Sequence, residues 1–179
     1  MPAIRPQLTH AGIYVFDLDK MRRFYTEVMG LMQTDTGHGS TFRNEFAFLS
    51  ADPTIHHQLI LADGRQAGSP STVNQLSFRV GSLAELRTVA RRVREYGIEE
   101  LKPVSHGNAW SIYFPDPESN WVEIYLDTPY HTAQPHADPL DLEASDEAIL
   151  RATETACAND PEFMPVAQWQ GRMREKLSG

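Results

Sequence analysis

Apolar and polar residues alternate in two stretches of the chain, and each alternating stretch runs directly into a helical pattern. Residues 8–31 begin with the run L-T-H-A-G-I-Y-V and continue as an amphipathic segment that ends at Gly30. Residues 73–98 repeat this order, from V-N-Q-L-S-F-R-V through a second amphipathic segment to Gly97. Because alternation predicts a strand and a 3.6-residue period predicts a helix, the chain carries a strand–helix pair twice.

Three short extended runs follow each strand–helix pair. An Asp-Pro turn precedes the last run in both halves, at Asp52-Pro53 and at Asp116-Pro117. The sequence therefore predicts the pattern βαβββ twice and an α+β fold. The extended runs are expected at about 32–37, 42–50 and 56–62 in the first half and at about 99–105, 110–115 and 121–127 in the second.

The last part of the chain, residues 129–179, differs in composition from the rest. It carries nine acidic and four basic residues, and its pattern predicts an extended strap and two helices, at Ser145–Asn159 and at Met164–Leu177. We therefore divide the chain into a domain of residues 1–128, with modules 7–63 and 73–128, and a C-terminal extension of residues 129–179. The helices are expected to pack on the domain or on a neighbouring subunit.

Composition narrows the class of protein. A net charge of −8 argues against nucleic-acid binding, which needs a basic face. The chain has one cysteine, Cys157, which excludes an internal disulfide framework and fits a reducing compartment. No apolar run approaches the roughly 20 residues that span a bilayer, and the N-terminus lacks a signal peptide pattern. We expect a cytoplasmic protein without membrane or nucleic-acid partners.

Two βαβββ modules, with His10 in the first strand and Glu123 in the last, resemble the vicinal oxygen chelate superfamily, which includes glyoxalase, bleomycin resistance proteins and extradiol dioxygenases. The resemblance implies that the modules form a cup-shaped mixed sheet with a metal ion inside. Ligands in that family come from the first and last strands of the modules, which here implies His10, Gln75 and Glu123. His57 is the alternative to Gln75 as the third ligand. The implied site requires His10 and Glu123 to converge.

A second resemblance is narrower and lies in residues 106–123. His106, a short spacer, an apolar residue with Tyr113, the turn Asp116-Pro117 and then Glu123 are similar to the motif of type I extradiol ring-cleavage dioxygenases. Ser119 stands where those enzymes prefer Gly or Pro, and Gln75 stands where they place a histidine ligand. The segment around His57 is similar to the one that carries a histidine next to the metal ligands in those enzymes.

The resemblance implies an Fe(II) enzyme that cleaves a catechol-like diol, such as 2,3-dihydroxybiphenyl, with O2 in aromatic compound catabolism. Its catalytic residues would be His57, His106 and Tyr113, its partner a small aromatic substrate, and its form a homo-oligomer. One alternative is a glyoxalase- or epimerase-type enzyme that uses Mn(II), Ni(II) or Zn(II) as a Lewis acid, which Gln75 favours. Another is a metal-free protein that sequesters a small molecule.

Each site residue also has an ordinary structural explanation. Tyr113 could be a packing residue of a strand, because strands favour aromatic side chains. His106 could be a turn residue before Gly107. The acidic extension is expected to be structural or oligomeric rather than catalytic. Three histidines are expected to be solvated in loops: His38, His131 and His136.

Overall fold

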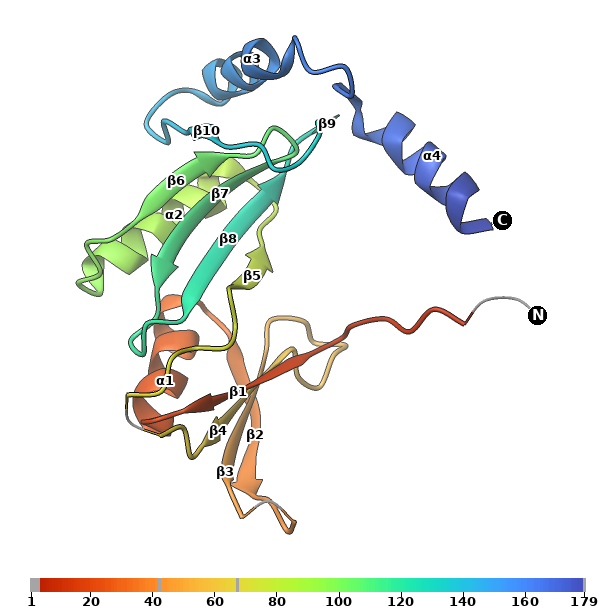
Figure 1. The fold of residues 1–179 in the computed structure, drawn as a ribbon. Coiled ribbons are helices and arrows are strands. Elements are labelled where there is room, and N and C mark those ends of the chain that lie inside the picture. Colours follow the sequence, from red (N-terminus) through yellow and green to blue (C-terminus); the bar gives the residue numbers. More distant parts are fainter. Residues whose placement is uncertain (1–3, 42, 67, 179) are drawn as a thin grey trace. The chain divides into compact units, whose positions relative to one another are not determined.

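The computed structural model describes residues 4–41, 43–66 and 68–178. The chain divides into two compact units. Unit 1 runs up to Thr72 and includes the loop Asp116–Asn120, and unit 2 comprises Val73–Pro115 and the chain from Trp121 onward. Unit 1 contains one sheet, and unit 2 contains a five-stranded sheet and a two-stranded sheet; in each unit a helix follows the first strand (Figure 1).

Unit 1 has the predicted βαβββ order. Its sheet has the strand order β1-β4-β3-β2, in which β1 is parallel to β4 and the other neighbours are antiparallel. Register pairs Ile13 with Leu61 between the parallel strands. The elements are β1 (Ala11–Val15), α1 (Leu18–Arg23), a π-helical turn η1 (Phe24–Val28), β2 (Met32–His38), β3 (Glu45–Ser50) and β4 (Leu59–Asp63).

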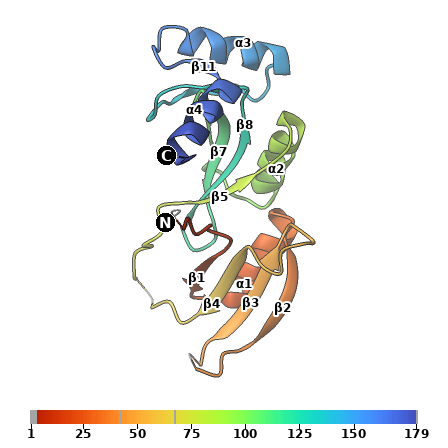
Figure 2. The ribbon, with the colours of Figure 1, turned by 90° about the vertical axis from the view of Figure 1, so that its right-hand side faces the viewer.

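Helix α1 covers one face of this sheet and encloses the core of unit 1. Asp17 begins the helix, because its side chain accepts a hydrogen bond of 2.9 Å from the backbone N–H of Lys20. The following apolar residues recur at helical spacing and pack on β3 and β4 (Figure 2). Residues buried in this layer include Val15, Met21, Phe24, Tyr25, Leu49 and Leu61.

The loop Asp116–Asn120 is fixed inside unit 1 by buried polar contacts. The hydroxyl of Tyr25 donates a hydrogen bond of 3.0 Å to Oδ2 of Asp116. Oε1 of Glu118 accepts from the backbone N–H groups of Phe16 and Asp17, at 2.7 and 2.8 Å. The predicted Asp-Pro turn therefore stabilises the start of α1, where unpaired N–H groups favour a carboxylate.

Unit 2 contains the second βαβββ pattern and the C-terminal extension. Its sheet has the order β10-β6-β7-β8-β5, in which β5 is parallel to β8 and the other neighbours are antiparallel. The first elements are β5 (Leu76–Arg79), α2 (Leu83–Glu95), β6 (Lys102–Ser105), β7 (Ala109–Pro115) and β8 (Trp121–Asp127). The elements of the extension are β9 (Tyr130–His131), β10 (Asp138–Pro139), α3 (Asp146–Cys157), β11 (Met164–Pro165) and α4 (Val166–Ser178).

Helix α2 covers one face of the sheet in unit 2 (Figure 2). Ser82 caps the helix by accepting a hydrogen bond from the N–H of Glu85. The buried stripe of α2 packs on inward-facing residues of β7 and β8, such as Ile112 and Ile124. Because side chains alternate along a strand, the residues between them, including Tyr113 and Glu123, point to the other face. The stripe consists of Leu83, Leu86, Val89, Ala90 and Val93.

The C-terminal extension packs on unit 2 through α3 and β10. The indole Nε1 of Trp110 donates a hydrogen bond of 2.8 Å to Oγ1 of Thr153 in α3, and β10 pairs with β6. No described residue of α4 is buried. The expectation that His131 and His136 are solvated is wrong: His131 stacks on Trp169, and His136 is partly buried and forms an ion pair with Asp138.

Within the described residues, no helix combines the length and the apolar character that a bilayer crossing needs.

Candidate metal and substrate site

Three of the predicted site residues meet on the open face of the unit 2 sheet. Tyr113 in β7 and Glu123 in β8 are direct partners in the antiparallel register. The hydroxyl of Tyr113 donates a hydrogen bond to Oε1 of Glu123 and lies 2.9 Å from Nε2 of His106. The sheet therefore joins His106, Tyr113 and Glu123 in one hydrogen-bonded chain.

The carboxylate of Glu123 is buried, with 7% of the residue exposed, and is surrounded by neutral donors. Oε2 accepts from Nε2 of Gln75 at 2.8 Å and from the hydroxyl of Ser77 at 2.6 Å. Oε1 accepts from the hydroxyl of Ser111 at 2.8 Å and from Tyr113. Among the described residues, no lysine or arginine pairs with this carboxylate. These four hydrogen bonds fill the acceptor sites of the carboxylate. A metal ion could supply the missing positive charge, and its binding would replace one of the four hydrogen bonds.

Gln75 reaches Glu123 because β5 runs parallel to β8. Ser77 is the register partner of Glu123, and Gln75 lies immediately before β5, two residues earlier on the same face. Sequence reasoning found Gln75 but missed Ser77 and Ser111. The sequence feature that could have indicated both serines is the two-residue period of a strand. It places Ser77 on the same face as Gln75, and Ser111 on the same face as Tyr113.

The imidazole of His106 is held at both nitrogens. Its Nδ1 lies 2.7 Å from the carbonyl oxygen of His136, and a carbonyl oxygen carries no hydrogen, so Nδ1 holds the proton and donates. The single hydroxyl hydrogen of Tyr113 points to Glu123. A hydrogen bond between Tyr113 and Nε2 therefore forms in one of two ways. Either Nε2 also carries a proton and donates it to the hydroxyl oxygen, or Tyr113 turns its hydrogen from Glu123 to Nε2.

The hydroxyl of Tyr113 stays neutral in this environment. Burial raises its pKa well above the ordinary value, and the hydrogen bond to Glu123 raises the pKa further. The hydroxyl therefore serves as a hydrogen-bond donor rather than a phenolate. It lies at a hollow of about 420 Å³ whose lining also includes Ser77, His106, Glu123, Tyr125 and Gln134.

The other two predicted site residues lie together in unit 1. His10 is exposed and immediately precedes β1, and His57 lies in the loop before β4 rather than within the expected strand. Their ring centroids are 4.5 Å apart, and Nδ1 of His57 lies 2.9 Å from Nδ1 of His56. Desolvation lowers the pKa of His57, and the neighbouring His10 and His56 lower the pKa further. Unit 1 thus presents a group of imidazoles that favours the neutral, ligand-competent form of His57.

The donor types fit a divalent cation. In unit 2, Glu123 and Gln75 end in oxygen atoms, a donor type that binds divalent metals. In the part of the chain that the structure describes, no three side chains of the His, Cys, Asp or Glu types gather into a metal-binding cluster. The expected ligand set contains an amide and residues of both units, and it stays a prediction.

The sequence matches a known family over the region that carries these residues. The family model described as the Glyoxalase/Bleomycin resistance protein/Dioxygenase superfamily matches residues 7–124. The chain belongs to this superfamily. The resemblance drawn from His10, Glu123 and the repeated βαβββ pattern is therefore confirmed at the level of the family.

Two curated relatives within the superfamily are dioxygenases from Rhodococcus globerulus. Biphenyl-2,3-diol 1,2-dioxygenase 3 is 29% identical over 130 residues, which cover 69% of this chain and 65% of the relative. Biphenyl-2,3-diol 1,2-dioxygenase 2 is 25% identical over 127 residues, which cover 68% of this chain and 63% of the relative. The matched region thus spans somewhat less than two thirds of each relative.

Solved structures of the superfamily share the fold. A glyoxylase/bleomycin resistance protein/dioxygenase domain from Frankia sp. EAN1pec matches 70% of this chain and 100% of its own, with a TM-score of 0.59 and 23% identity. The fosfomycin resistance protein FosX from Listeria monocytogenes, solved with Mn(II) and sulfate, matches 70% of this chain and 95% of its own, with a TM-score of 0.54 and 22% identity. The predicted α+β class with two βαβββ modules is confirmed.

Proposed function

We propose that the protein is a metal-dependent extradiol-type dioxygenase that cleaves a catechol-like aromatic diol with O2. The observation that carries this proposal is the hydrogen-bonded chain His106–Tyr113–Glu123. These three residues are the ones that the sequence motif predicts, and the sheet joins them at a hollow. The two diol dioxygenases among the relatives of this chain add support.

The surroundings of Glu123 support a bound divalent cation. Its buried carboxylate has four neutral donors and no cationic side chain among the described residues. We propose Glu123 and Gln75 as oxygen ligands and His10 as the imidazole ligand, with Fe(II) as the metal. His57, next to His10, is the alternative to Gln75. When bound, Fe(II) supplies the redox chemistry that lets a diol react with O2.

The side chains around the hollow would manage the protons of the diol. Tyr113 offers a neutral hydroxyl as donor to a substrate oxygen, and Nε2 of His106 is placed to accept or return a proton through that hydroxyl. We propose His57 as a second base beside His10. The overall reaction consumes one O2 per diol, breaks the ring carbon–carbon bond next to the diol, and leaves both oxygen atoms in the ring-opened product.

Gln75 supports a second candidate function. An amide oxygen is a neutral and weaker ligand than the imidazole that extradiol enzymes place there. It suits a Lewis-acid enzyme of the glyoxalase or epimerase class with Mn(II), Ni(II) or Zn(II). In that case the same His106 and Tyr113 would transfer a proton on a metal-bound substrate without consuming O2.

The test is an oxygen-uptake assay. The protein is purified without oxygen, loaded with Fe(II), and mixed in air with catechol or 2,3-dihydroxybiphenyl. The proposal predicts one O2 consumed per diol and a yellow ring-opened product. Tight binding of a divalent metal without oxygen uptake over a broad panel of diols would transfer the assignment to the Lewis-acid class. A protein that binds no divalent metal would overturn both assignments.

A further inference from the structure

The segment that follows β8 returns to His106 and contacts its backbone and ring. We call residues 128–139 the strap. The carbonyl oxygen of His136 accepts a hydrogen bond of 2.7 Å from Nδ1 of His106. Nε2 of Gln134 donates a hydrogen bond of 2.8 Å to the carbonyl oxygen of His106. The His106 residue is therefore held by the strap at its side chain and at its main chain.

Gln134 ties the two histidine backbones together. While its Nε2 donates to His106, its Oε1 accepts a hydrogen bond of 3.2 Å from the backbone N–H of His136. Nε2 also lies 3.3 Å from Oδ1 of Asn108. One amide thus fixes the distance between the main chain of His106 and the carbonyl group that receives its Nδ1 proton.

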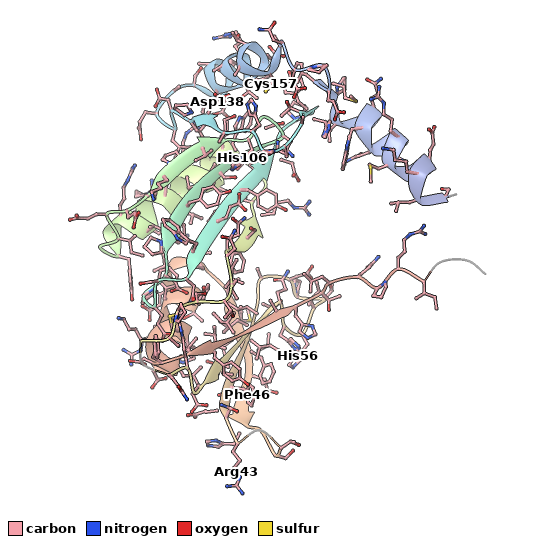
Figure 3. All side chains as sticks on the ribbon, in the orientation of Figure 1. Arg43, Phe46, His56, His106, Asp138 and Cys157 are labelled. Atoms are coloured by element: carbon pink, nitrogen blue, oxygen red, sulfur yellow. The ribbon has the colours of Figure 1, made fainter. Side chains whose placement is uncertain are left out.

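The strap is anchored on both sides of these contacts. Asp138 pairs with Ser105 where β10 joins β6, and its carboxylate lies 2.8 Å from Nε2 of His136. Figure 3 shows Asp138 and Cys157 near His106 at this end of unit 2. On the other side, Oγ1 of Thr128 donates a hydrogen bond of 2.6 Å to the carbonyl oxygen of Gly107.

Gly107 shows how closely the strap approaches the turn after His106. A Cβ atom at this position would lie 2.4 Å from Cγ2 of Thr132 and 2.8 Å from Sγ of Cys157. Its φ of +72° is also in the left-handed region that favours glycine. The turn and the strap therefore fit together only because position 107 has no side chain.

We propose that the strap is a positioning element of the site, in which Gln134 and the carbonyl of His136 fix the tautomer and the ring orientation of His106. Because Nδ1 is committed to a carbonyl oxygen, the proton that His106 exchanges is the one at Nε2, which faces Tyr113. The catalytic consequence rests on the proposed function, whereas the tautomer does not. The C-terminal extension is then part of the site and not only a structural appendage.

The test compares Gln134→Glu with Gln170→Glu on α4. Glutamate keeps the size of Gln134 but loses the donor to His106, and Gln170, which is exposed, controls for the added charge. Nitrogen-15 spectra of labelled histidines report the tautomer. We expect His106 to carry its proton at Nδ1 in the unmodified protein and after Gln170→Glu. Gln134→Glu should give a mixture that includes the form with Nε2–H and a free Nδ1.

The same variants separate the positioning role from the proposed reaction. In the Fe(II)-loaded protein we expect Gln134→Glu to lower kcat about tenfold with little change in KM, as loss of a supporting hydrogen bond typically does. A histidine spectrum in which His106 lacks a proton at Nδ1, or one that Gln134→Glu leaves unchanged, overturns the positioning role. If the expected spectra appear but no diol is cleaved, the positioning role stands and the proposed function fails.

Discussion

Tyr113 donates a hydrogen bond to Glu123 across the antiparallel pair β7 and β8, in which the two residues are direct register partners. This contact explains why the motif spaces its tyrosine and its glutamate on either side of an Asp-Pro turn. The turn returns the chain so that the two side chains meet on the same face of the sheet. Tyr113 and Glu123, which are separated in the sequence motif, are therefore neighbours in the folded sheet.

Removing this hydroxyl should impair catalysis more than folding. We expect Tyr113→Phe to lower kcat/KM for a diol substrate about 100-fold, within the range for loss of a proton-transfer group. Tyr125→Phe is the matched control, because Tyr125 lies on β8 and lines the same hollow. Steady-state oxygen uptake measures both. A kcat/KM for Tyr113→Phe equal to that of the unmodified protein would show that Tyr113 is an ordinary packing residue.

The turn that carries the motif contains a strained position. Ser119 has a φ of +65°, in the left-handed region that costs a non-glycine residue roughly 1–2 kcal/mol. We expect Ser119→Gly to raise the free energy of unfolding by about 0.5–1 kcal/mol, after the extra backbone entropy of glycine is subtracted. Ser119→Ala, which keeps the strain, should give no gain. Urea denaturation distinguishes the two, and equal stabilities would contradict the strain argument.

A buried ion pair holds the same loop in unit 1. Nη1 of Arg65 lies 3.6 Å from Oε2 of Glu118, which has no hydrogen-bond partner among the described residues, and both side chains are almost fully buried. Arg65→Ala leaves this carboxylate unpaired and should cost about 3 kcal/mol. The exposed pair of Arg79 and Asp127 is the control, and Arg79→Ala should cost at most about 1 kcal/mol. Chemical denaturation measures both values, and comparable costs would contradict the assignment.

The ionisation of Tyr25 makes the free energy of unfolding depend on pH in the alkaline range. Burial raises its pKa well above the ordinary value, and the negative charge of Asp116 raises the pKa further. The folded state therefore retains the hydroxyl proton that the unfolded chain loses near pH 10, so this stabilisation is complete below pH 10 and is lost as the pH rises above it. Tyr25→Phe should cost about 1 kcal/mol at pH 8 through the lost hydrogen bond.

The slope of stability against pH separates this effect from general alkaline damage. Above pH 10 the free energy of unfolding should fall less steeply for Tyr25→Phe than for the unmodified protein, by up to about 1.4 kcal/mol per pH unit. Tyr14→Phe, at a side chain with 59% of its surface exposed, serves as the control. Denaturation curves between pH 8 and pH 11 provide the measurement. Parallel slopes for Tyr25→Phe and the unmodified protein would exclude the role of Tyr25.

Regular periodicity made most of the fold predictable. The alternation W-V-E-I-Y-L-D gave the bounds of β8, Trp121–Asp127, as the structure has them. The strand before the linker was predicted too early, at residue 56 instead of Leu59. The reason lies in side chains: Oδ1 of Asp52 accepts from the N–H of Thr54, and Oε1 of Gln58 accepts from the N–H of Ala51. These contacts stabilise a loop that the hydropathy pattern does not indicate.

The grouping of these side chains was predictable where a motif or a repeat marks it and unpredictable where distant segments meet. His106, Tyr113 and Glu123 were implied by the resemblance of one local stretch to the extradiol motif, and Gln75 by its equivalence to His10 in the repeat. Gln134 does not, because its role arises from the return of the strap over the turn at Gly107. A polar residue in an irregular segment carries no period that could reveal this contact.

The most direct test of the account is the affinity for Mn(II) without oxygen, measured by calorimetry for three proteins. The unmodified chain and Glu95→Gln, which alters an exposed carboxylate on α2, should each bind one Mn(II) per site with similar affinity. Glu123→Gln should lose measurable binding, because an uncharged amide replaces the buried carboxylate ligand. If Glu123→Gln binds Mn(II) as tightly as the unmodified chain, Glu123 is not a metal ligand and the proposed dioxygenase site is wrong.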